Sequence, residues 1–166
     1  MPTVFLISDT HFGHAGMCRF LNQDGSKVRP WDNPDEMDEA MVDNWNRVVK
    51  TGDKVYHLGD VAMAKKNLAI LSRLNGRKVL IKGNHDIFKI KDYAEHFYDV
   101  RASHKLGNFI LTHIPVHPDS ITNRWCAGNV HGHMHNNVID DPRYHNVSVE
   151  RINYTPYPFD ELNRPG

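Results

Sequence analysis

The first half of the chain alternates short, continuously apolar runs with longer amphipathic segments. A short run that is apolar throughout is typical of a strand buried on both faces. Between residues 33 and 48, Asn-Pro-Asp-Glu begins a segment whose apolar residues recur at helical spacing, which predicts a helix. A second amphipathic helix is predicted over 65–74, where Asn75-Gly76 ends the pattern. The three apolar runs, each predicted to be a strand, are 4–7, 55–58 and 78–81.

The second half has weak helical periodicity and shorter β-rich runs. Leu106-Gly107-Asn108 predicts a tight turn, and the proline-bearing tail over 155–166 is expected to be an extended strap. We expect this half to supply a second sheet. The predicted fold is α/β: two facing mixed β-sheets flanked by helices, an αββα sandwich, in a single domain over residues 1–166. The strands predicted here are 99–103, 109–112, 129–131 and 146–152.

Composition narrows the classes of protein without naming one. With 166 residues, 40% of them hydrophobic, the chain suits one domain with its own core. A formal net charge of +0 gives no bulk attraction to a long polyanion. Cys18 and Cys126 are too few for a disulfide framework and are expected to be reduced. No run resembles a signal peptide or spans a bilayer, so a cytoplasmic protein without membrane contact is expected.

Side chains that bind metals gather directly after the predicted strands. Carboxylate oxygen, imidazole nitrogen and sometimes a neutral amide oxygen suit hard or borderline divalent cations, and a pair of cations needs one carboxylate that can bridge. Asp60 is the natural bridge, and Gly59, Gly83 and Gly132 are expected to let the backbone turn sharply. The pattern predicts a two-metal site suited to phosphate ester hydrolysis. The clusters are Asp9-Thr10-His11, Gly59-Asp60, Gly83-Asn84-His85-Asp86, Thr112-His113 and Gly132-His133-Met134-His135.

In this order, the five clusters resemble the motifs of the calcineurin-like metallophosphoesterase family, and they extend from Asp9 to His135. Asp9-Thr10-His11-Phe12-Gly13-His14, followed by Arg29-Pro30-Trp31, is similar to compact bacterial and phage members. Protein Ser/Thr phosphatases carry an Asp-Arg pair after the Gly-Asp turn, which this chain lacks. The resemblance implies His85 as the catalytic acid, with Asp86 orienting it. It also implies one metal on Asp9, His11, Asp60 and His135, and another on Asp60, Asn84, His113 and His133.

The predicted reaction is direct attack of a metal-bridging hydroxide on a phosphodiester or nucleotide-type phosphate ester, with His85 as general acid. Mn²⁺ is the expected metal, with Fe, Zn, Ni and Mg as alternatives. His14, Arg29 and Arg124 are candidates to bind substrate phosphate, and Trp31 offers a face for base stacking.

Other functions remain open at this point. The same site suits a phosphomonoesterase, a non-catalytic metal-binding scaffold of the same fold, or a regulatory metal- or nucleotide-binding module. Neither cysteine has an arginine at the spacing of a cysteine phosphatase, and no Walker loop is present. The expected partner is a phosphate ester substrate, such as a nucleotide or a nucleic-acid end, and no protein partner is evident.

Overall fold

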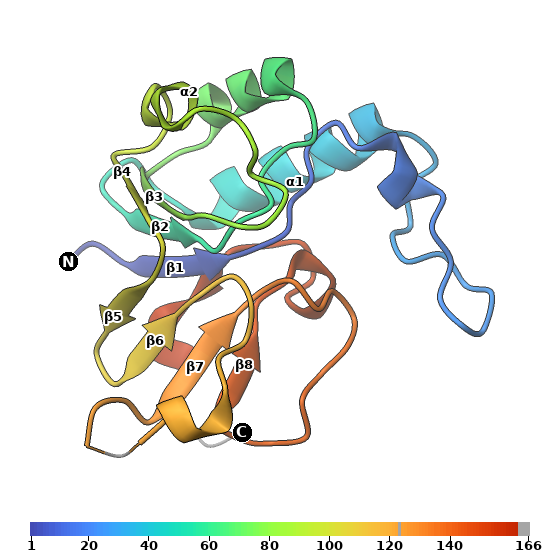
Figure 1. Ribbon diagram of the computed structural model, residues 1–166. Coiled ribbons are helices and arrows are strands. Elements are labelled where there is room, and N and C mark those ends of the chain that lie inside the picture. The colour runs from blue at the N-terminus through green and yellow to red at the C-terminus, as the bar shows by residue number, and fades with distance from the viewer. Residues whose placement is uncertain (123, 163–166) are drawn as a thin grey trace.

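The computed structural model describes residues 1–122 and 124–162, which form two mixed β-sheets and a layer of helices (Figure 1). The first sheet has the order β4-β3-β2-β1-β9, with β9 antiparallel to β1 and the other pairs parallel. Its strands are β1 (Val4–Ile7), β2 (Lys54–His57), β3 (Arg77–Ile81), β4 (Asp99–Arg101) and β9 (Tyr157–Pro158).

The second sheet has the order β5-β6-β7-β8, in which only the β5–β6 hairpin is antiparallel. Gly107 turns this hairpin with a φ of 55°, as the sequence predicts. The strands are β5 (His104–Leu106), β6 (Phe109–Leu111), β7 (Gly128–His131) and β8 (Tyr144–Asn146).

Two α-helices and five 3₁₀ helices complete the described fold. The helix predicted over 33–48 forms as α1 (Pro34–Val48), where the Asn33 side chain accepts a hydrogen bond from the Glu36 backbone N–H at 3.0 Å. The other helices are α2 (Ile90–Ala94), η1 (Ala15–Cys18), η2 (Lys65–Arg73), η3 (Pro118–Ser120), η4 (Val149–Arg151) and η5 (Phe159–Glu161). In residues 1–122 and 124–162, none of these helices has the length and apolarity needed to cross a membrane.

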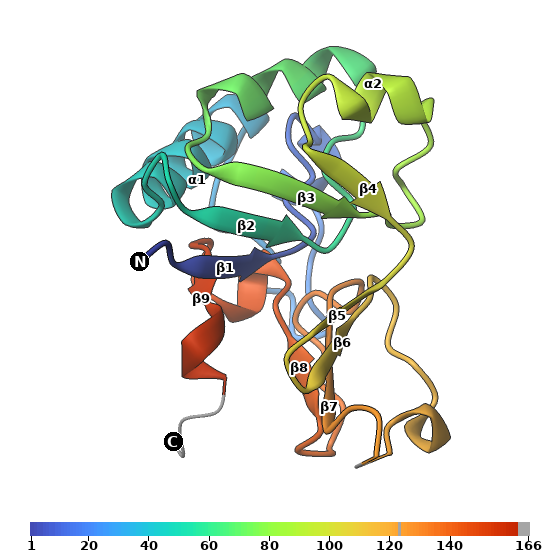
Figure 2. The ribbon, with the colours of Figure 1, turned by 90° about the vertical axis from the view of Figure 1, so that its left-hand side faces the viewer.

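Strands β1, β2 and β3 of the first sheet are largely buried on both faces because each face packs against a different layer. Phe5 and Ile7 of β1 contact the cluster under α1 and η2, which includes Trp45. Leu6 points the other way, into the cluster between the sheets. Figures 1 and 2 show α1, η2 and α2 together over the outer face of the first sheet, with the second sheet on its other side. The predicted α/β fold with two facing mixed sheets is confirmed.

Several predicted elements were wrong. The helix predicted over 65–74 does form, over Lys65–Arg73, but as a 3₁₀ helix. Strand β4 pairs in parallel with β3, so it belongs to the first sheet. The strand predicted over 146–152 ends at Asn146, and η4 follows it. The second sheet packs its outer apolar residues, Ile110 among them, against Ile121 of the loop after η3 instead of an α-helix.

The tail was predicted as a simple strap, but it adds edge strand β9 and helix η5. The last part of that prediction, over 163–166, lies outside the described residues. Sequence analysis also missed α2 and β5, which are five and three residues long. Such short elements carry too little periodicity to be recognised.

Candidate metal centre

The predicted ligand clusters meet because the strands before them run in the same direction. β1, β2 and β3 are parallel, as are β6 and β7, so the loops after their carboxyl ends lie at one edge of each sheet. A backbone hydrogen bond from Val149 of η4 to the Ser8 carbonyl links the segments that follow β8 and β1, beside Asp9. Two groups of ligands result, each with its metal-binding atoms within 4.8 Å of one another: Asp9, His11 and His135, and Asp60, His113 and His133.

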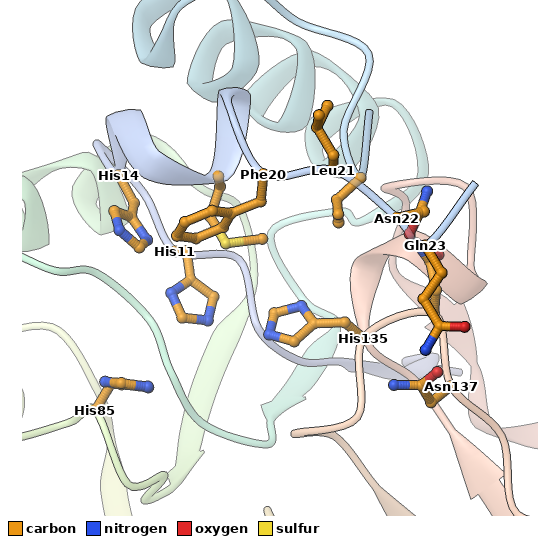
Figure 3. Close-up of a pocket in the computed structure, with 12 residues that line it drawn as sticks. His11, His14, Phe20, Leu21, Asn22, Gln23, His85, His135 and Asn137 are labelled. Atoms are coloured by element: carbon orange, nitrogen blue, oxygen red, sulfur yellow. Dashed lines mark hydrogen bonds between the residues drawn. The ribbon is translucent and has the colours of Figure 1, made fainter. Parts of the chain in front are cut away.

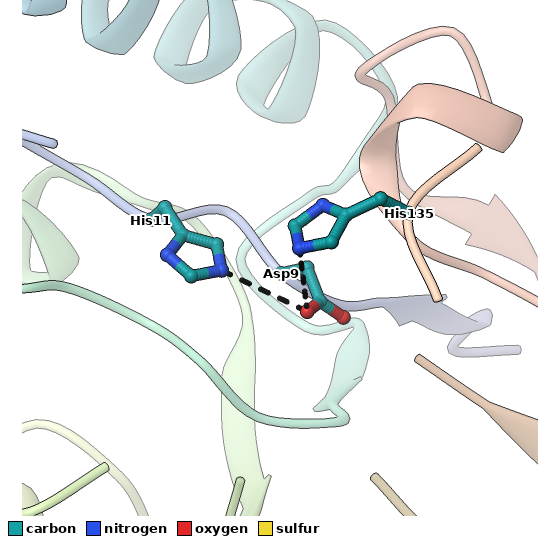
Figure 4. Close-up of side chains that lie close together, drawn as sticks. All are labelled: Asp9, His11 and His135. Carbon is teal, nitrogen blue, oxygen red and sulfur yellow. Dashed lines mark ion pairs between the residues drawn. The ribbon is translucent and has the colours of Figure 1, made fainter. Parts of the chain in front are cut away.

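The first group lies at the end of β1, where Asp9 and His11 are buried and His135 is half-buried (Figure 4). Asp9 Oδ1 lies 3.8 Å from His11 Nε2 and 3.7 Å from His135 Nε2. These separations exceed a hydrogen bond, and among the described residues Asp9 Oδ1 and both ring nitrogens of His11 have no hydrogen-bond partner. Buried polar atoms without partners are costly, so this group fits a cation that would satisfy them.

The second group gathers around Asn84. The side-chain oxygen of Asn84 lies 2.8 Å from His113 Nε2 and 3.1 Å from His133 Nδ1. The other ring nitrogen of His113 is 2.7 Å from the Leu58 carbonyl, which can only accept a hydrogen bond. That contact fixes the tautomer and leaves Nε2 free for a metal, an arrangement common for metal-binding histidines.

Asp60 lies between the two groups. Its Oδ2 atom is 3.6 Å from His11 Nε2 and 3.3 Å from His113 Nε2. Its Oδ1 atom accepts a hydrogen bond from the His85 backbone at 2.9 Å. One carboxylate therefore faces ligands of both groups, and the donor set, oxygen and nitrogen without sulfur, fits two divalent cations.

Five of these ligands have a left-handed backbone, which is uncommon for residues other than glycine. The φ angles are 59° at Asp9, 49° at His11, 57° at Asp60, 69° at His133 and 50° at His135. Each such residue costs on the order of 1–3 kcal/mol unless its surroundings stabilise it. The loops therefore hold strained conformations that turn the side chains toward a common point.

The glycines of the clusters act in two ways. Gly59 has a φ of 104°, so it supplies the sharp turn that was predicted. Gly83 and Gly132 instead permit close packing, because a β-carbon on Gly83 would lie 2.7 Å from the Asp60 backbone nitrogen. A β-carbon on Gly132 would collide with Ser8 and Asp9. Both glycines let the ligand loops approach one another.

The structure corrects the prediction that Arg29 binds substrate. Its side chain is fully buried and donates hydrogen bonds to the backbone carbonyls of Asp9 at 2.5 Å and Thr10 at 2.7 Å. Its Nε atom lies 3.3 Å from Glu150 Oε2. Trp31 packs edge-on against Tyr154, with ring centroids 4.6 Å apart. Arg29 therefore positions the ligand loop after β1.

Glu150 is a residue of this centre that sequence analysis missed. Its Oε2 atom is 2.8 Å from His135 Nδ1, so the carboxylate orients the imidazole and leaves Nε2 for a metal. Burial alone would raise the pKa of Glu150, but the His135 hydrogen bond and the Arg29 charge outweigh it and lower the pKa. No motif marks Glu150, because its arginine partner is 121 positions away in the sequence.

The predicted role of Asp86 is also corrected. Its buried carboxylate accepts hydrogen bonds from the backbone N–H groups of Gly83 at 2.7 Å, Asp60 at 2.8 Å and Val61 at 3.0 Å. It therefore ties the loops after β2 and β3 together rather than orienting the His85 ring. His85 itself is exposed, with its ring centroid 5.7 Å from that of His11.

A cleft of about 600 Å³ opens beside the first ligand group (Figure 3). His14, His85, His11 and His135 line it. Burial, together with the nearby His11, lowers the pKa of His14 to about 4, which keeps this imidazole neutral at neutral pH. Arg124 lies on an exposed loop and is not among the described residues that line the cleft, so its contact with substrate stays a prediction.

His57 supports the centre from beneath. It is fully buried, and burial lowers its pKa to about 3, so the ring is neutral. Nδ1 accepts a hydrogen bond from the Gly59 backbone at 3.1 Å, and Nε2 is 2.9 Å from the Thr10 hydroxyl. The ring therefore links the loops after β1 and β2. Cys18 and Cys126 are both buried and free.

Comparisons with known proteins give similar proteins in archaea, bacteria and a phage. No family model matches the sequence. The uncharacterized protein MJ1445 of Methanocaldococcus jannaschii is 37% identical over 171 aligned positions, which cover 96% of this chain and 89% of MJ1445. Gene 66 protein of Mycobacterium phage L5 is 32% identical over 91 positions, covering 52% of this chain and 41% of the phage protein.

Two crystal structures share the whole fold. AQ665, a protein of unknown function from Aquifex aeolicus, superposes with a TM-score of 0.74 at 27% identity over 98% of both chains. The phosphopantetheinyl hydrolase PptH of Mycobacterium tuberculosis superposes with a TM-score of 0.51 at 14% identity over 99% of both chains. At that identity, the likeness to PptH shows a common fold alone.

Proposed function

The chain belongs to the family of the archaeal protein MJ1445, and we propose that it is a phosphoesterase that uses two divalent cations at the candidate metal centre. The observation that carries this proposal is the position of Asp60, whose Oδ2 atom faces His11 and His113 of the two groups at 3.6 and 3.3 Å. A shared carboxylate is what a pair of neighbouring cations requires.

The two groups would hold the cations as the resemblance to calcineurin-like metallophosphoesterases implies. Asp9, His11, Asp60 and His135 would bind one, and Asp60, Asn84, His113 and His133 the other. When bound, the cations supply positive charge that neutralises phosphate oxygens and activates water for attack. An oxygen- and nitrogen-rich donor set suits Mn²⁺, and availability would select among Mn, Fe, Zn, Ni and Mg. PptH, a phosphopantetheinyl hydrolase of the same fold, is consistent with a hydrolytic function.

The protein side chains carry the proton transfer. Water adds to phosphorus, and the bond from phosphorus to the leaving oxygen breaks. His85, exposed at the wall of the cleft, gives that oxygen a proton. The attacking water loses a proton to solvent, and His85 takes one back from solvent. The Asp60 carboxylate accepts a hydrogen bond from the His85 backbone, which fixes the position of His85 relative to the candidate ligands. The neutral His14 ring offers a hydrogen bond to a phosphate oxygen.

The open site favours a diester. His85 and His133 are exposed, and no covering segment lies over them among the described residues. A second substituent on the phosphate therefore has room to extend into solvent or along the cleft. A phosphomonoesterase on the same site is the alternative. Hydrolysis rates for the diester bis(p-nitrophenyl) phosphate and the monoester p-nitrophenyl phosphate distinguish the two functions.

The test removes and restores the metal. Protein treated with a chelator should be inactive on bis(p-nitrophenyl) phosphate and regain activity with Mn²⁺. Asp60→Ala should lose both ions together in metal analysis, since only a bridging carboxylate serves two sites. Asp43→Ala, at an exposed aspartate on α1, should retain them. Activity that survives exhaustive chelation would refute the proposal. Two ions bound without any turnover would support the non-catalytic scaffold instead.

A further inference from the structure

The cleft beside the metal centre extends well beyond the ligands. From His11, His85 and His135 it runs along η1 and the segment 19–28 to Asn136 and Asn137 (Figure 3). A volume of about 600 Å³ lies within the range of pockets that bind small organic molecules. A phosphate alone would fill a small part of it, so the rest of the cleft is available to the group that the phosphate carries.

The walls of this extension are apolar and amide-bearing, without charge. In the described part of the chain, no lysine, arginine, aspartate or glutamate lines it. An uncharged wall favours an uncharged group with both an apolar face and hydrogen-bonding edges. The apolar residues are Met17, Phe20, Leu21 and Val28, and the carboxamides are Asn22, Gln23, Asn136 and Asn137.

Phe20 presents an aromatic surface to the cleft. Its side chain is 50% exposed, although it touches the His14 ring edge-on at a centroid distance of 5.8 Å. Gly16 permits this arrangement, because a β-carbon there would lie 2.8 Å from His14 Nε2 and 3.1 Å from Phe20 Cζ. An exposed aromatic ring beside a phosphate site is suited to stacking against a planar ring.

The segment that carries Phe20 is held in place. Val28 donates a backbone hydrogen bond to the Phe20 carbonyl at 2.9 Å, and the Asn22 amide donates to the Ser26 hydroxyl at 3.0 Å. The Asn136 side chain donates to Asn22 Oδ1 at 3.2 Å, which ties this segment to the loop after β7. Phe20 is therefore presented by a braced hairpin, at a fixed place relative to His135.

Gln23 and Asn137 supply the polar edge. Both are exposed, and Figure 3 shows them close together at the end of the cleft away from His85. A carboxamide donates and accepts at once, and paired donor and acceptor atoms are what asparagine and glutamine use to bind adenine. An aromatic face and two carboxamide edges in one uncharged cleft therefore match a nucleobase.

We propose that the cleft binds the nucleoside of a nucleoside phosphate ester, with the base stacked on Phe20 and hydrogen-bonded by Gln23 and Asn137. This inference rests on the proposed function, because it names the group carried by the phosphate that the metal centre would cleave. The phosphate would lie near His11, His85 and His14, and the base would lie toward Asn137.

The test uses two substrates with the same leaving group, adenosine 5′-(p-nitrophenyl phosphate) and methyl p-nitrophenyl phosphate, with the Mn²⁺-loaded protein. The adenosine ester should have a kcat/KM at least about 10-fold higher. Phe20→Ala should reduce the ratio of the two kcat/KM values, adenosine ester over methyl ester, by about 5- to 100-fold, the range for losing one stacked base. Trp125→Ala, which removes an aromatic ring of nearly the same exposure (49%) outside the cleft lining, should affect neither substrate.

Equal kcat/KM for the two esters, or an equal loss on both in Phe20→Ala, would overturn the inference while leaving the phosphoesterase intact. If neither ester is hydrolysed, the proposed function fails, and binding of adenosine to the metal-free protein decides the role of the cleft. Saturation-transfer NMR should then detect adenosine with the wild type and Trp125→Ala but not with Phe20→Ala. No signal with the wild type would refute nucleoside binding.

Discussion

Arg29→Met separates a positioning role for Arg29 from a role in substrate binding. The guanidinium is fully buried and holds the carbonyls of Asp9 and Thr10 as well as Glu150 Oε2. Methionine keeps much of the apolar volume but leaves Glu150 as a buried carboxylate without its arginine. Removing one partner of a buried ion pair costs about 3–5 kcal/mol. At about 2–4 °C per kcal/mol for a chain of this length, Tm should fall by about 6–20 °C.

The assay is thermal and urea unfolding of the metal-free protein followed by circular dichroism, which gives Tm and the free energy of unfolding without any activity. Arg73→Met is the control, because Arg73 is half exposed and its pair with Glu39 lies at the surface. Exposed pairs contribute little, so this variant should unfold close to the wild type. The double variant Arg29→Met/Glu150→Gln should regain part of the lost stability, because it no longer buries an unpaired carboxylate.

Wild-type stability in Arg29→Met, together with a higher KM for phosphodiesters, would refute this reasoning. It would mean that Arg29 leaves its buried position and meets the substrate. A loss of stability that Glu150→Gln does not relieve would show that the carbonyl contacts, rather than the ion pair, dominate.

Two further changes test the acid and the pH dependence of folding. His85→Ala should keep both metals and lose about 10²- to 10⁴-fold in turnover with poor leaving groups, and less with a p-nitrophenyl ester, so an equal loss on both would contradict acid catalysis. Burial, with Asp35 and Glu39 nearby, raises the pKa of Asp38 to about 6. Between about pH 4 and 6, Asp38 holds a proton in the folded protein that it has lost in the unfolded chain. The free energy of unfolding should therefore fall as the pH rises through this range. Relative to wild type, Asp38→Asn should raise the free energy of unfolding by about 1–2 kcal/mol at pH 8, after allowance for partial exposure, and leave it unchanged near pH 4. A difference in urea unfolding that does not depend on pH would refute this.

The ligand loops were predictable because the signal is local. Asp9, Asp60 and Asn84 each follow a short apolar strand, and parallel strands bring such loops to one edge. The second sheet was predicted less well, since strands of three residues carry little pattern. Strand β4 was assigned to the wrong sheet because pairing between distant strands leaves no mark in a local window.

The partners of the ligands were not predictable. Arg29 and Glu150 are brought together only by the fold. An arginine close in sequence to the metal-binding motifs suggests phosphate binding, and the sequence alone does not show that its side chain is buried. The family resemblance implied that Asp86 orients the His85 ring. In the folded chain its carboxylate turns to three backbone N–H groups instead, and only the geometry of the turn determines that.

The left-handed backbone at the ligands has a consequence for how such a protein changes over generations. Asp9, His11, Asp60, His133 and His135 all hold a conformation that glycine would adopt without strain. Mutation to glycine at these positions removes a ligand and relieves local strain at the same time. Since selection for folding alone tolerates such changes, descendants freed from selection for metal binding should lose their ligands readily while keeping the two sheets. Exchange of any one of these five residues for glycine is therefore expected to remove a candidate ligand without unfolding the two sheets.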